Sequence, residues 1–377
     1  MLIKNKNGVA LILVLTIVML LTTVIFSINY RVRKSLNLSI ATKKQTSLYH
    51  MADSGIDLGI WMLLKDAKNS DPDSVDSVHD DWAKKAIVNQ YAKDLVFEQG
   101  NVKVYITDEM GKIKVNALIK QYPGSTVDED QKKIWENVLD FLISSDKSED
   151  ISDSESIIDG MIDWLDQNDL SSANGAETDY YESQKNPYKA KNGPLKTVEE
   201  LNLIKGMNQN LFNIENFINN LTAKGNDNKK DNDSVYKLDD YLTVAGNMEN
   251  DSKQLSFDGK ININTAKLPV ILALLPKDAS KVDRYYYAKA MIDFRDEVDD
   301  TGVGKNSLKG SWYTKCSGCL GSGIEKSNMV TTVSNIYSIE SKATIENFET
   351  TIKAIIERYL DKVSGKWKYK IISYRTY

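Results

Sequence analysis

The sequence contains few of the residues that enzymes most often use for catalysis. Only two His and two Cys occur among its 377 residues. With so few His, neither a Ser/His/Asp constellation nor a His-based zinc site is expected, and no Gly-rich loop of the kind that cradles phosphate is present. We expect His50 and His79 to be surface residues, and we expect the protein not to be an enzyme.

An excess of positive charge is also missing. The formal net charge is −5, whereas binding to nucleic acid needs a concentrated basic face. The hydrophobic content of 41% and charged content of 27% are ordinary for a folded protein. The length allows one large domain or two modest ones. Nucleic acid is therefore not an expected partner.

One long stretch, by contrast, contains no charge at all. Residues 9–28 are uncharged, and about 20 apolar residues suffice for a helix to cross the hydrocarbon core of a membrane. A secretory signal peptide has its cleavage site after the apolar stretch. Here the candidate site, between Gly8 and Val9, precedes it, so cleavage would leave the apolar helix on the mature protein. An uncut signal anchor is the alternative.

This basic leader, with Lys4 and Lys6 ahead of Gly8, resembles the class III leader of type IV pilins and type II secretion pseudopilins. The resemblance implies that a prepilin peptidase of the inner membrane cuts after Gly8 and methylates Val9. The fifth mature residue is then Leu13, where most members have Glu. Type K minor pseudopilins usually lack that Glu, which suits a subunit at the tip of the fibre with no subunit above it.

The charges that flank the apolar block give conflicting indications of orientation. Lys4 and Lys6 precede it, whereas a second basic cluster follows it, and the positive-inside rule alone would place that second cluster in the cytoplasm. The resemblance implies the opposite, a single-pass inner-membrane protein with its C-terminal bulk in the periplasm. A long folded remainder crosses the membrane largely regardless of nearby charge, so we expect the periplasmic orientation.

Apolar residues recur at helical spacing well beyond the block, through Leu36, Ile40, Leu48 and Ile56. No Pro interrupts residues 9–65, so we expect one helix of more than 50 residues, roughly 80 Å long at 1.5 Å per residue. Further on, alternating residues predict a hairpin near 102–117 and strands over 333–343, 350–359 and 366–374. The stretch 350–359 also fits a helix.

The pattern between these β segments is helical, which predicts an α+β fold with an inserted helical domain. Asn262-Ile263-Asn264-Thr265-Ala266, followed by apolar helices, resembles a helix-hairpin-helix motif with Thr265 as the N-cap. Residues 197–207 look like an earlier copy, with Thr197 as the cap. The turn at 276–280 lacks the glycines of DNA-binding members. We therefore expect packing modules or a protein-binding surface.

The resemblance to type K pseudopilins extends over nearly the whole chain. It implies a long N-terminal helix on a small antiparallel pilin-like sheet with a large inserted all-α domain of helix-hairpin-helix-like (SAM-like) repeats. The expected divisions are a leader (1–8), a membrane part (9–28) and a periplasmic part (29–65) of the helix, a first α/β part (66–125), the insert (126–300) and a C-terminal β part (301–377). The stretches that carry the resemblance are Asp108-Glu109-x-Gly111-Lys112-Ile113-x-Val115-Asn116, Asp163-Trp164-x-Asp166, Gly175-Ala176-Glu177-x-Asp179-Tyr180-Tyr181, Asn186-Pro187-Tyr188-x-Ala190-x-Asn192 and Leu242-Thr243-Val244.

The same resemblance implies a role in assembly. The protein would form the tip of the periplasmic pseudopilus with minor pseudopilins of types I and J and help to initiate its assembly for export of folded proteins. The major pseudopilin and the inner-membrane assembly platform are further implied partners. Two other functions stay open: a type IV minor pilin, and a membrane-anchored DNA-binding or DNA-uptake protein that uses the helix-hairpin-helix motifs.

Acidic side chains gather in the middle of the chain. Hard oxygen ligands at close spacing suit Ca²⁺, which takes six to eight oxygens, although the EF-hand spacing is absent. A solvated loop is the alternative, and calcium binding is also what the type K resemblance implies. The candidate ligands are Asp163, Asp166, Asp169, Glu177 and Asp179.

Cys316 and Cys319 lie in a Gly-rich and Ser-rich stretch. A redox C-x-x-C motif normally opens a helix after a strand, and two Cys cannot complete a four-ligand zinc site. A periplasmic location would favour a disulfide between them. Because it would close a short loop, it would contribute little to global stability.

Overall fold

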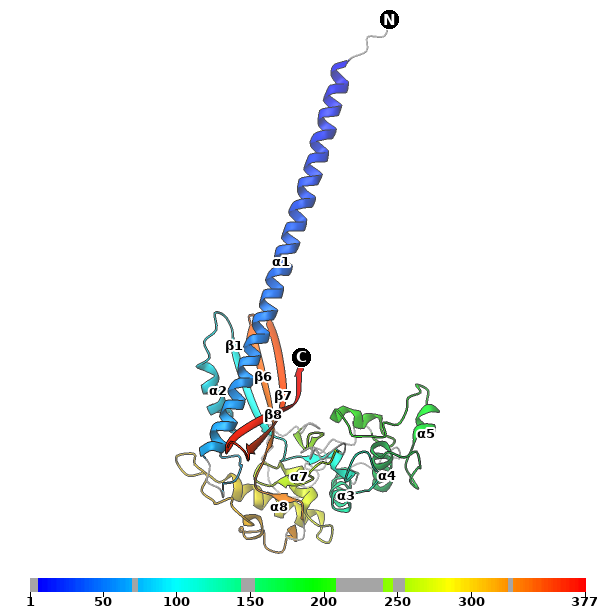
Figure 1. Ribbon diagram of the computed structural model, residues 1–377, viewed down its shortest axis with the longest axis vertical. Coiled ribbons are helices and arrows are strands. Elements are labelled where there is room, and N and C mark those ends of the chain that lie inside the picture. The colour runs from blue at the N-terminus through cyan, green and yellow to red at the C-terminus, as the bar shows by residue number, and fades with distance from the viewer. Residues whose placement is uncertain (1–5, 70–73, 144–152, 208–239, 247–254, 325–327) are drawn as a thin grey trace.

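A single long helix projects from a head formed by the rest of the chain (Figure 1). This computed structural model describes residues 6–69, 74–143, 153–207, 240–246, 255–324 and 328–377. The helix, α1 (Lys6–Asn69), contains 64 residues, which confirms the prediction of one helix longer than 50 residues. It is long and apolar enough to cross a membrane, and its most apolar window, with a mean hydropathy of 3.0, is entirely exposed. The first five residues of the predicted leader lie outside the described residues.

A four-stranded antiparallel sheet lies against the lower part of α1. Its strands are β1 (Asn101–Asp108), β6 (Ile336–Ile345), β7 (Phe348–Asp361) and β8 (Lys366–Thr376), in the order β1-β6-β7-β8. The three C-terminal strands were predicted, and the stretch that also fitted a helix is the strand β7. Since β1 pairs with β6, the whole intervening segment is an insertion between neighbouring strands.

The predicted hairpin near 102–117 is wrong. Its first half is β1, but the partner of β1 is β6. After a turn, β2 (Ile113–Lys114) pairs in parallel with β3 (Leu242–Thr243), and η1 (Val115–Leu118) is a 3-10 helix. Every residue from 111 to 119 is buried, so the apparent alternation does not mark a strand with one solvent face. These side chains fill the core of the inserted domain instead.

The face of α1 that contacts the sheet is the one expected from the helical spacing, and Leu48 and Ile56 on it are buried. Helix and sheet approach closely at Gly59, where an added Cβ would lie 2.6 Å from the Cγ2 of Ile339. Helix α2 (Lys85–Lys93) covers the outer edge of β1. There the side-chain amide of Asn89 donates to the carbonyl of Val104 (3.3 Å) and accepts from its N–H (3.1 Å), as a neighbouring strand would.

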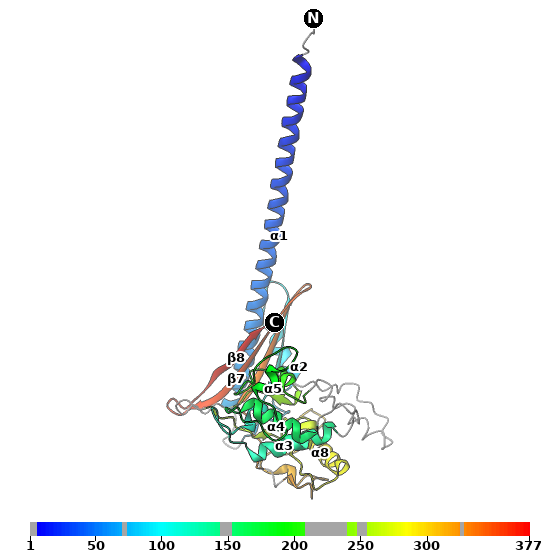
Figure 2. The same ribbon diagram turned by 90° about the vertical axis from the view of Figure 1, so that its right-hand side faces the viewer.

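The inserted domain has its own apolar core, separate from the one between α1 and the sheet. It lies at the end of the head opposite the N-terminus of α1, and both views agree on this (Figures 1 and 2). Its elements besides β2, β3 and η1 are α3 (Glu129–Ile143), α4 (Ser154–Leu165), α5 (Thr178–Glu182), η2 (Val198–Leu203), β4 (Ile261–Asn262), α7 (Leu268–Leu274), α8 (Lys281–Asp296), η5 (Trp312–Thr314) and β5 (Val330–Thr331).

The boundaries predicted for this domain, 126 and 300, need correction on both sides. Ile113 and Leu118 already belong to its core, as do Leu308, Trp312 and Ile324. Strand β4 pairs with β5, which lies just before β6. The insertion therefore occupies the whole stretch between β1 and β6. Residues after 300 belong to it because apolar burial, rather than helix content, decides where the domain ends.

The two predicted helix-hairpin-helix copies differ in how far the structure matches them. Helices α7 and α8 form the later pair, but α7 begins after Lys267, and Thr265 is not its cap. The earlier copy is the short 3-10 helix η2, where a capping box joins Thr197 and Glu200, as predicted for Thr197. The residues after 207 lie outside the described part of the chain. The structure does not show helix-hairpin-helix repeats.

Candidate functional site

The end of β1 meets the inserted domain at a buried carboxylate, Asp108. Its Oδ1 accepts a hydrogen bond from the N–H of Met110 at 2.7 Å. Its Oδ2 accepts from Asn262 Nδ2 (3.1 Å), the hydroxyl of Thr265 (2.5 Å) and that of Ser334 (2.6 Å). Thr265 is engaged here, which explains why it does not cap α7. Burial raises the pKa of Asp108 to about 6, although these hydrogen bonds act in the opposite direction.

A second buried carboxylate, Asp76, lies beside this point and binds Arg358 from β7. The guanidinium donates from Nη2 to Asp76 Oδ1 at 2.6 Å, and from Nη1 to the carbonyl of Leu63 near the end of α1 at 3.0 Å. The hydroxyl of Tyr337 donates to the same Asp76 oxygen at 2.6 Å. Asn262 links the carboxylate of Asp108 to the backbone of Asp76, because its amide also donates to the carbonyl of Asp76 at 3.0 Å. The stem helix, the sheet and the insert therefore meet in one polar network, which we call the junction.

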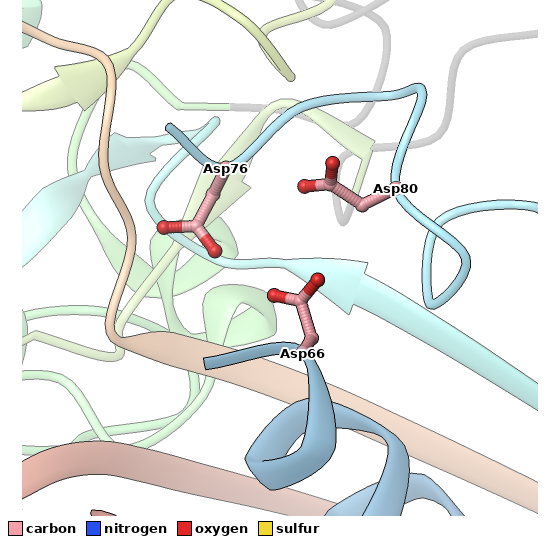
Figure 3. Close-up of side chains that lie close together, drawn as sticks. All are labelled: Asp66, Asp76 and Asp80. Atoms are coloured by element: carbon pink, nitrogen blue, oxygen red, sulfur yellow. The ribbon is translucent and has the colours of Figure 1, made fainter. Parts of the chain in front are cut away.

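Three acidic side chains of the junction point toward one another (Figure 3). Oxygens of Asp66, Asp76 and Asp80 all lie within 4.8 Å of each other. Arg358 pairs with two of the three, since it contacts Asp66 at 3.2 Å as well as Asp76. Asp80 accepts from the N–H of Ser77 at 2.8 Å, and its burial raises its pKa to about 7. The arrangement is that of a structural ion-pair network. Local patterns could not indicate this network, because Arg358 is far away in the chain.

A different acidic group, formed by the predicted calcium ligands, lies around the end of α4. Asp163 is fully buried and accepts from the N–H and hydroxyl of Ser172 at 3.1 and 2.6 Å. Asp166 accepts from the N–H and the amide nitrogen of Asn168 at 3.1 and 2.6 Å. Gly175 lies against the carboxylate of Asp163, where a side chain would not fit. The chain after α4 therefore folds back over these carboxylates.

Glu177 is the member of this group whose buried carboxylate is not balanced by hydrogen bonds within the described residues. It is only 6% exposed, and neither carboxylate oxygen has a hydrogen-bond partner within the described residues. Burial, together with the charges of Asp163, Asp166 and Asp169, raises its pKa to about 8. A buried carboxylate surrounded by others is costly unless a cation balances it. A cation would balance these charges, but in this structure no three of these four carboxylates bring oxygens within 4.8 Å of one another.

One further oxygen of this group was not predicted. Asn192 donates from Nδ2 to Asp169 at 3.0 Å, while its own amide oxygen is buried without a partner among the described residues. Its φ of 49° places it in the left-handed region, which Asn tolerates better than most residues. Carboxylate and amide oxygens are the ligands that Ca²⁺ prefers. The signal for Asn192 was its place in a stretch that resembles type K pseudopilins.

Not every predicted ligand joins this group. Asp179 is exposed on the first turn of α5 and makes no hydrogen bond or ion pair to the other carboxylates within the described residues. Asp163, Asp166, Asp169 and Glu177 remain as the acidic candidates. The reason is local: α5 begins directly after Glu177, so its first turn directs Asp179 toward solvent.

The structure also places the two Cys and the residues around the predicted leader cleavage site. A disulfide joins Cys316 and Cys319, whose Cα atoms lie 5.2 Å apart and whose side chains are buried in the core of the inserted domain. Val9 and Leu13 are exposed in the apolar part of α1, at 66% and 56%, and an added Cβ on Gly8, just before them, would meet nothing within 4 Å.

The two His differ in their surroundings. His50 is exposed on α1, as expected for a surface residue. His79 is half-buried, which corrects the same expectation for it, and its Nε2 lies 2.6 Å from the carbonyl of Arg295.

Comparisons with known proteins agree on one family. Residues 111–214 match the family model of "Type II secretion system (T2SS), protein K". The chain is also 24% identical over 302 residues to the type II secretion system protein K of Pseudomonas aeruginosa, a match that covers 79% of this chain and 77% of that protein. The chain is therefore similar to the type II secretion protein K family, in residues 111–214 and over most of its length.

A solved structure supports the fold of this chain. One chain of the GspK-GspI-GspJ complex from the type 2 secretion system of enterotoxigenic Escherichia coli matches with a TM-score of 0.59. The match has 16% sequence identity and covers 89% of this chain and 97% of that one. A long N-terminal helix on a small antiparallel sheet is therefore confirmed as the α+β arrangement.

The raised pKa of Asp108 predicts a pH-dependent stability. Between pH 4 and 6 the folded state keeps the proton on Asp108 while the unfolded chain releases it. The stabilising contribution of the protonated Asp108 to the folded state is therefore fully present below about pH 4 and is lost as the pH rises through 6. Replacing Asp108→Asn should remove up to about 1.4 kcal/mol per pH unit from the slope of unfolding free energy in this window. Urea unfolding at pH 4, 5 and 6 measures it.

The matched control is Asp300→Asn, which neutralises an exposed carboxylate. It should leave the slope unchanged. An Asp108→Asn protein whose unfolding free energy followed the same pH dependence as the unsubstituted chain would contradict the assignment.

Proposed function

We propose that the protein is a minor pseudopilin that forms the tip of the periplasmic pseudopilus together with minor pseudopilins of types I and J. It would help to initiate assembly of the fibre for export of folded proteins, as a structural subunit rather than an enzyme. The observation that carries the proposal is the position of the inserted domain. It caps the end of the head opposite the N-terminus of α1 (Figures 1 and 2).

The shape explains why such a subunit would terminate a fibre. Pseudopilin helices would pack side by side in the core of the fibre, and heads would stack around them. A bulky domain at the far end of the head leaves no room for a further subunit above it. Leu13 supports this reading, because an uncharged side chain at this position needs no partner of opposite charge.

The exposed part of α1 needs partners of its own. Its apolar window has no buried residue within the chain, and apolar surface of this extent marks contact with lipid or with other proteins. We propose that residues 9–28 span the inner membrane before assembly, with the head in the periplasm. The helices of the other minor pseudopilins would replace the lipid contacts within the fibre, and the major pseudopilin and assembly platform would be later contacts.

We also propose that the acidic group around Glu177 binds Ca²⁺. Asp163, Asp166, Asp169, Glu177 and the amide oxygen of Asn192 would supply the oxygens. The ion would balance charges that the fold otherwise brings together without compensation, and it would hold the segment after α4 against the inserted domain. Its role would be structural, since metal binding to the folded state alone adds to stability.

The proposed processing of the leader predicts a defined N-terminus. In cells that contain a prepilin peptidase, the mature chain should begin at a methylated Val9. Mass spectrometry of the protein purified from membranes measures this. An N-terminus at Met1, or cleavage after the apolar block, would contradict the proposed leader.

The proposed tip role predicts a ternary complex. The soluble part, from residue 28 onward, should co-purify with the soluble parts of type I and type J pseudopilins from the same organism when calcium is present. Size-exclusion chromatography with light scattering should give one species with one copy of each. Three proteins that stay separate at micromolar concentration in calcium would overturn the assignment.

The proposed calcium site predicts that Glu177→Gln will raise the melting temperature without calcium but reduce the stabilisation that calcium gives. Without calcium, Glu177→Gln should raise the melting temperature near pH 7. With a pKa of about 8, the folded protein has to keep Glu177 protonated while the unfolded chain releases the proton, and Gln removes this penalty. With calcium, the unsubstituted protein should gain up to about 2.7 kcal/mol at an ion concentration 100 times its dissociation constant, and Glu177→Gln should lose most of this gain. Thermal unfolding with EDTA or calcium measures both.

Asp179→Asn serves as the control, since it removes an exposed acid two residues away. It should change neither melting temperature. Equal calcium responses in the Glu177→Gln protein and the unsubstituted one would exclude Glu177 as a ligand.

A further inference from the structure

Between the apolar block and Asp53, every charged residue of α1 is basic. The first acidic residue of the chain is Asp53, whereas five basic residues precede it after the block. They fall into two groups separated by eight uncharged residues, from Ser35 to Thr42. The first group, Arg31, Arg33 and Lys34, we call the basic collar. The second is Lys43 and Lys44.

The basic collar lies at the depth of lipid headgroups if residues 9–28 occupy the hydrocarbon core. At 1.5 Å per residue, its members are about 5 to 9 Å beyond Ile28 along the axis. The polar layer of a bilayer begins there and is several ångströms thick on each side. Tyr30 fits the same depth, because aromatic side chains with a polar end are enriched at membrane interfaces, and it is 69% exposed.

The three residues of the collar lie on one side of the helix. Successive residues of a helix are about 100° apart, so Arg31 and Lys34 are about 60° apart and Arg33 is about 100° from Lys34. The three side chains thus share an arc of about 160°. The choice of lipid over a protein partner therefore rests on the depth of these residues, and the experiment distinguishes the two.

Members of the collar have no balancing charge within the described residues of the chain. All three are exposed, and Arg33 makes a hydrogen bond from Nε to the amide oxygen of Asn29 at 3.0 Å. No carboxylate of the described residues forms an ion pair with any of them. Lys44 differs, because it pairs with Glu346 at 2.6 Å and lies over the ring of Phe348. The second group thus lies against the head.

We propose that the basic collar binds the phosphate groups of anionic phospholipids in the leaflet that faces the head. This rests on the proposed placement of residues 9–28 in the membrane. Two guanidinium groups and an ammonium group suit phosphate, and Arg can bind it with two parallel hydrogen bonds. The contacts set the depth of α1 and oppose its withdrawal from the bilayer until contacts with other subunits replace them.

The test compares two lipids around the full-length protein in vesicles. Electron paramagnetic resonance of spin-labelled phosphatidylglycerol and phosphatidylcholine measures the share of each that contacts the protein. The unsubstituted protein should favour phosphatidylglycerol by about threefold or more, and the preference should weaken in high salt. The triple variant Arg31→Gln, Arg33→Gln, Lys34→Gln should show a ratio near one.

The matched control is the double variant Lys43→Gln, Lys44→Gln. These residues lie roughly 13 to 15 Å further from the membrane than Lys34, which exceeds the Debye length of about 8 Å at physiological salt. The control should keep the preference. Flotation of each variant with vesicles confirms that it has inserted.

Four results would overturn the proposal. An inserted unsubstituted protein without a lipid preference, or a triple variant that keeps it, would exclude the collar as the lipid site. A triple variant that keeps the preference but no longer binds type I or type J pseudopilins would assign the collar to protein contacts. Failure of the unsubstituted protein to float with vesicles would instead overturn the membrane placement, and with it this proposal.

Discussion

The head of this protein depends on one buried guanidinium. Arg358 leaves the sheet and binds both the last turns of α1 and Asp76 in the loop that follows. A charge taken out of water is tolerated only when it is paired and hydrogen-bonded, so these segments have to come together. Asn262 then extends the network from Asp76 to Asp108. Because the two apolar cores are separate, this polar junction adds direct links between the stem and the inserted domain.

That connection matters for the proposed role. A tip subunit has to hold its bulky domain in a fixed position relative to the helix that enters the fibre, since a loosely tethered domain would not block further addition. The junction is placed where the stem ends and the insertion begins. The acidic group around Glu177 lies farther out in the insert, where a cation would hold one segment in place without altering the junction. In the proposed role, the stem enters the fibre, the junction fixes the position of the inserted domain, and the inserted domain blocks further addition.

Much of the fold could be predicted because it follows from local patterns. The 64-residue helix and the three C-terminal strands follow from periodicity, which neighbouring residues determine among themselves. The hairpin near 102–117 was predicted wrongly because alternation cannot reveal that Ile113 and Val115 are buried in another domain. Thr265 was taken as a helix cap for a similar reason: it suits a cap, but Asp108, distant in the chain, engages its hydroxyl. The candidate ligands from Asp163 to Glu177 are close in sequence and were predicted, whereas Asn192 is placed by its fold.

The sequence by itself therefore determined the apolar helix, the basic residues that follow it and the class of the fold, since each depends on residues within a few turns of one another. Only the tertiary structure decided that β1 pairs with β6, that Arg358 pairs with Asp66 and Asp76, and that Glu177 is buried without a hydrogen-bond partner among the described residues. These features join or bring together distant segments, and burying charged and polar groups is costly unless they pair with one another. No local pattern records which distant groups will share that burial.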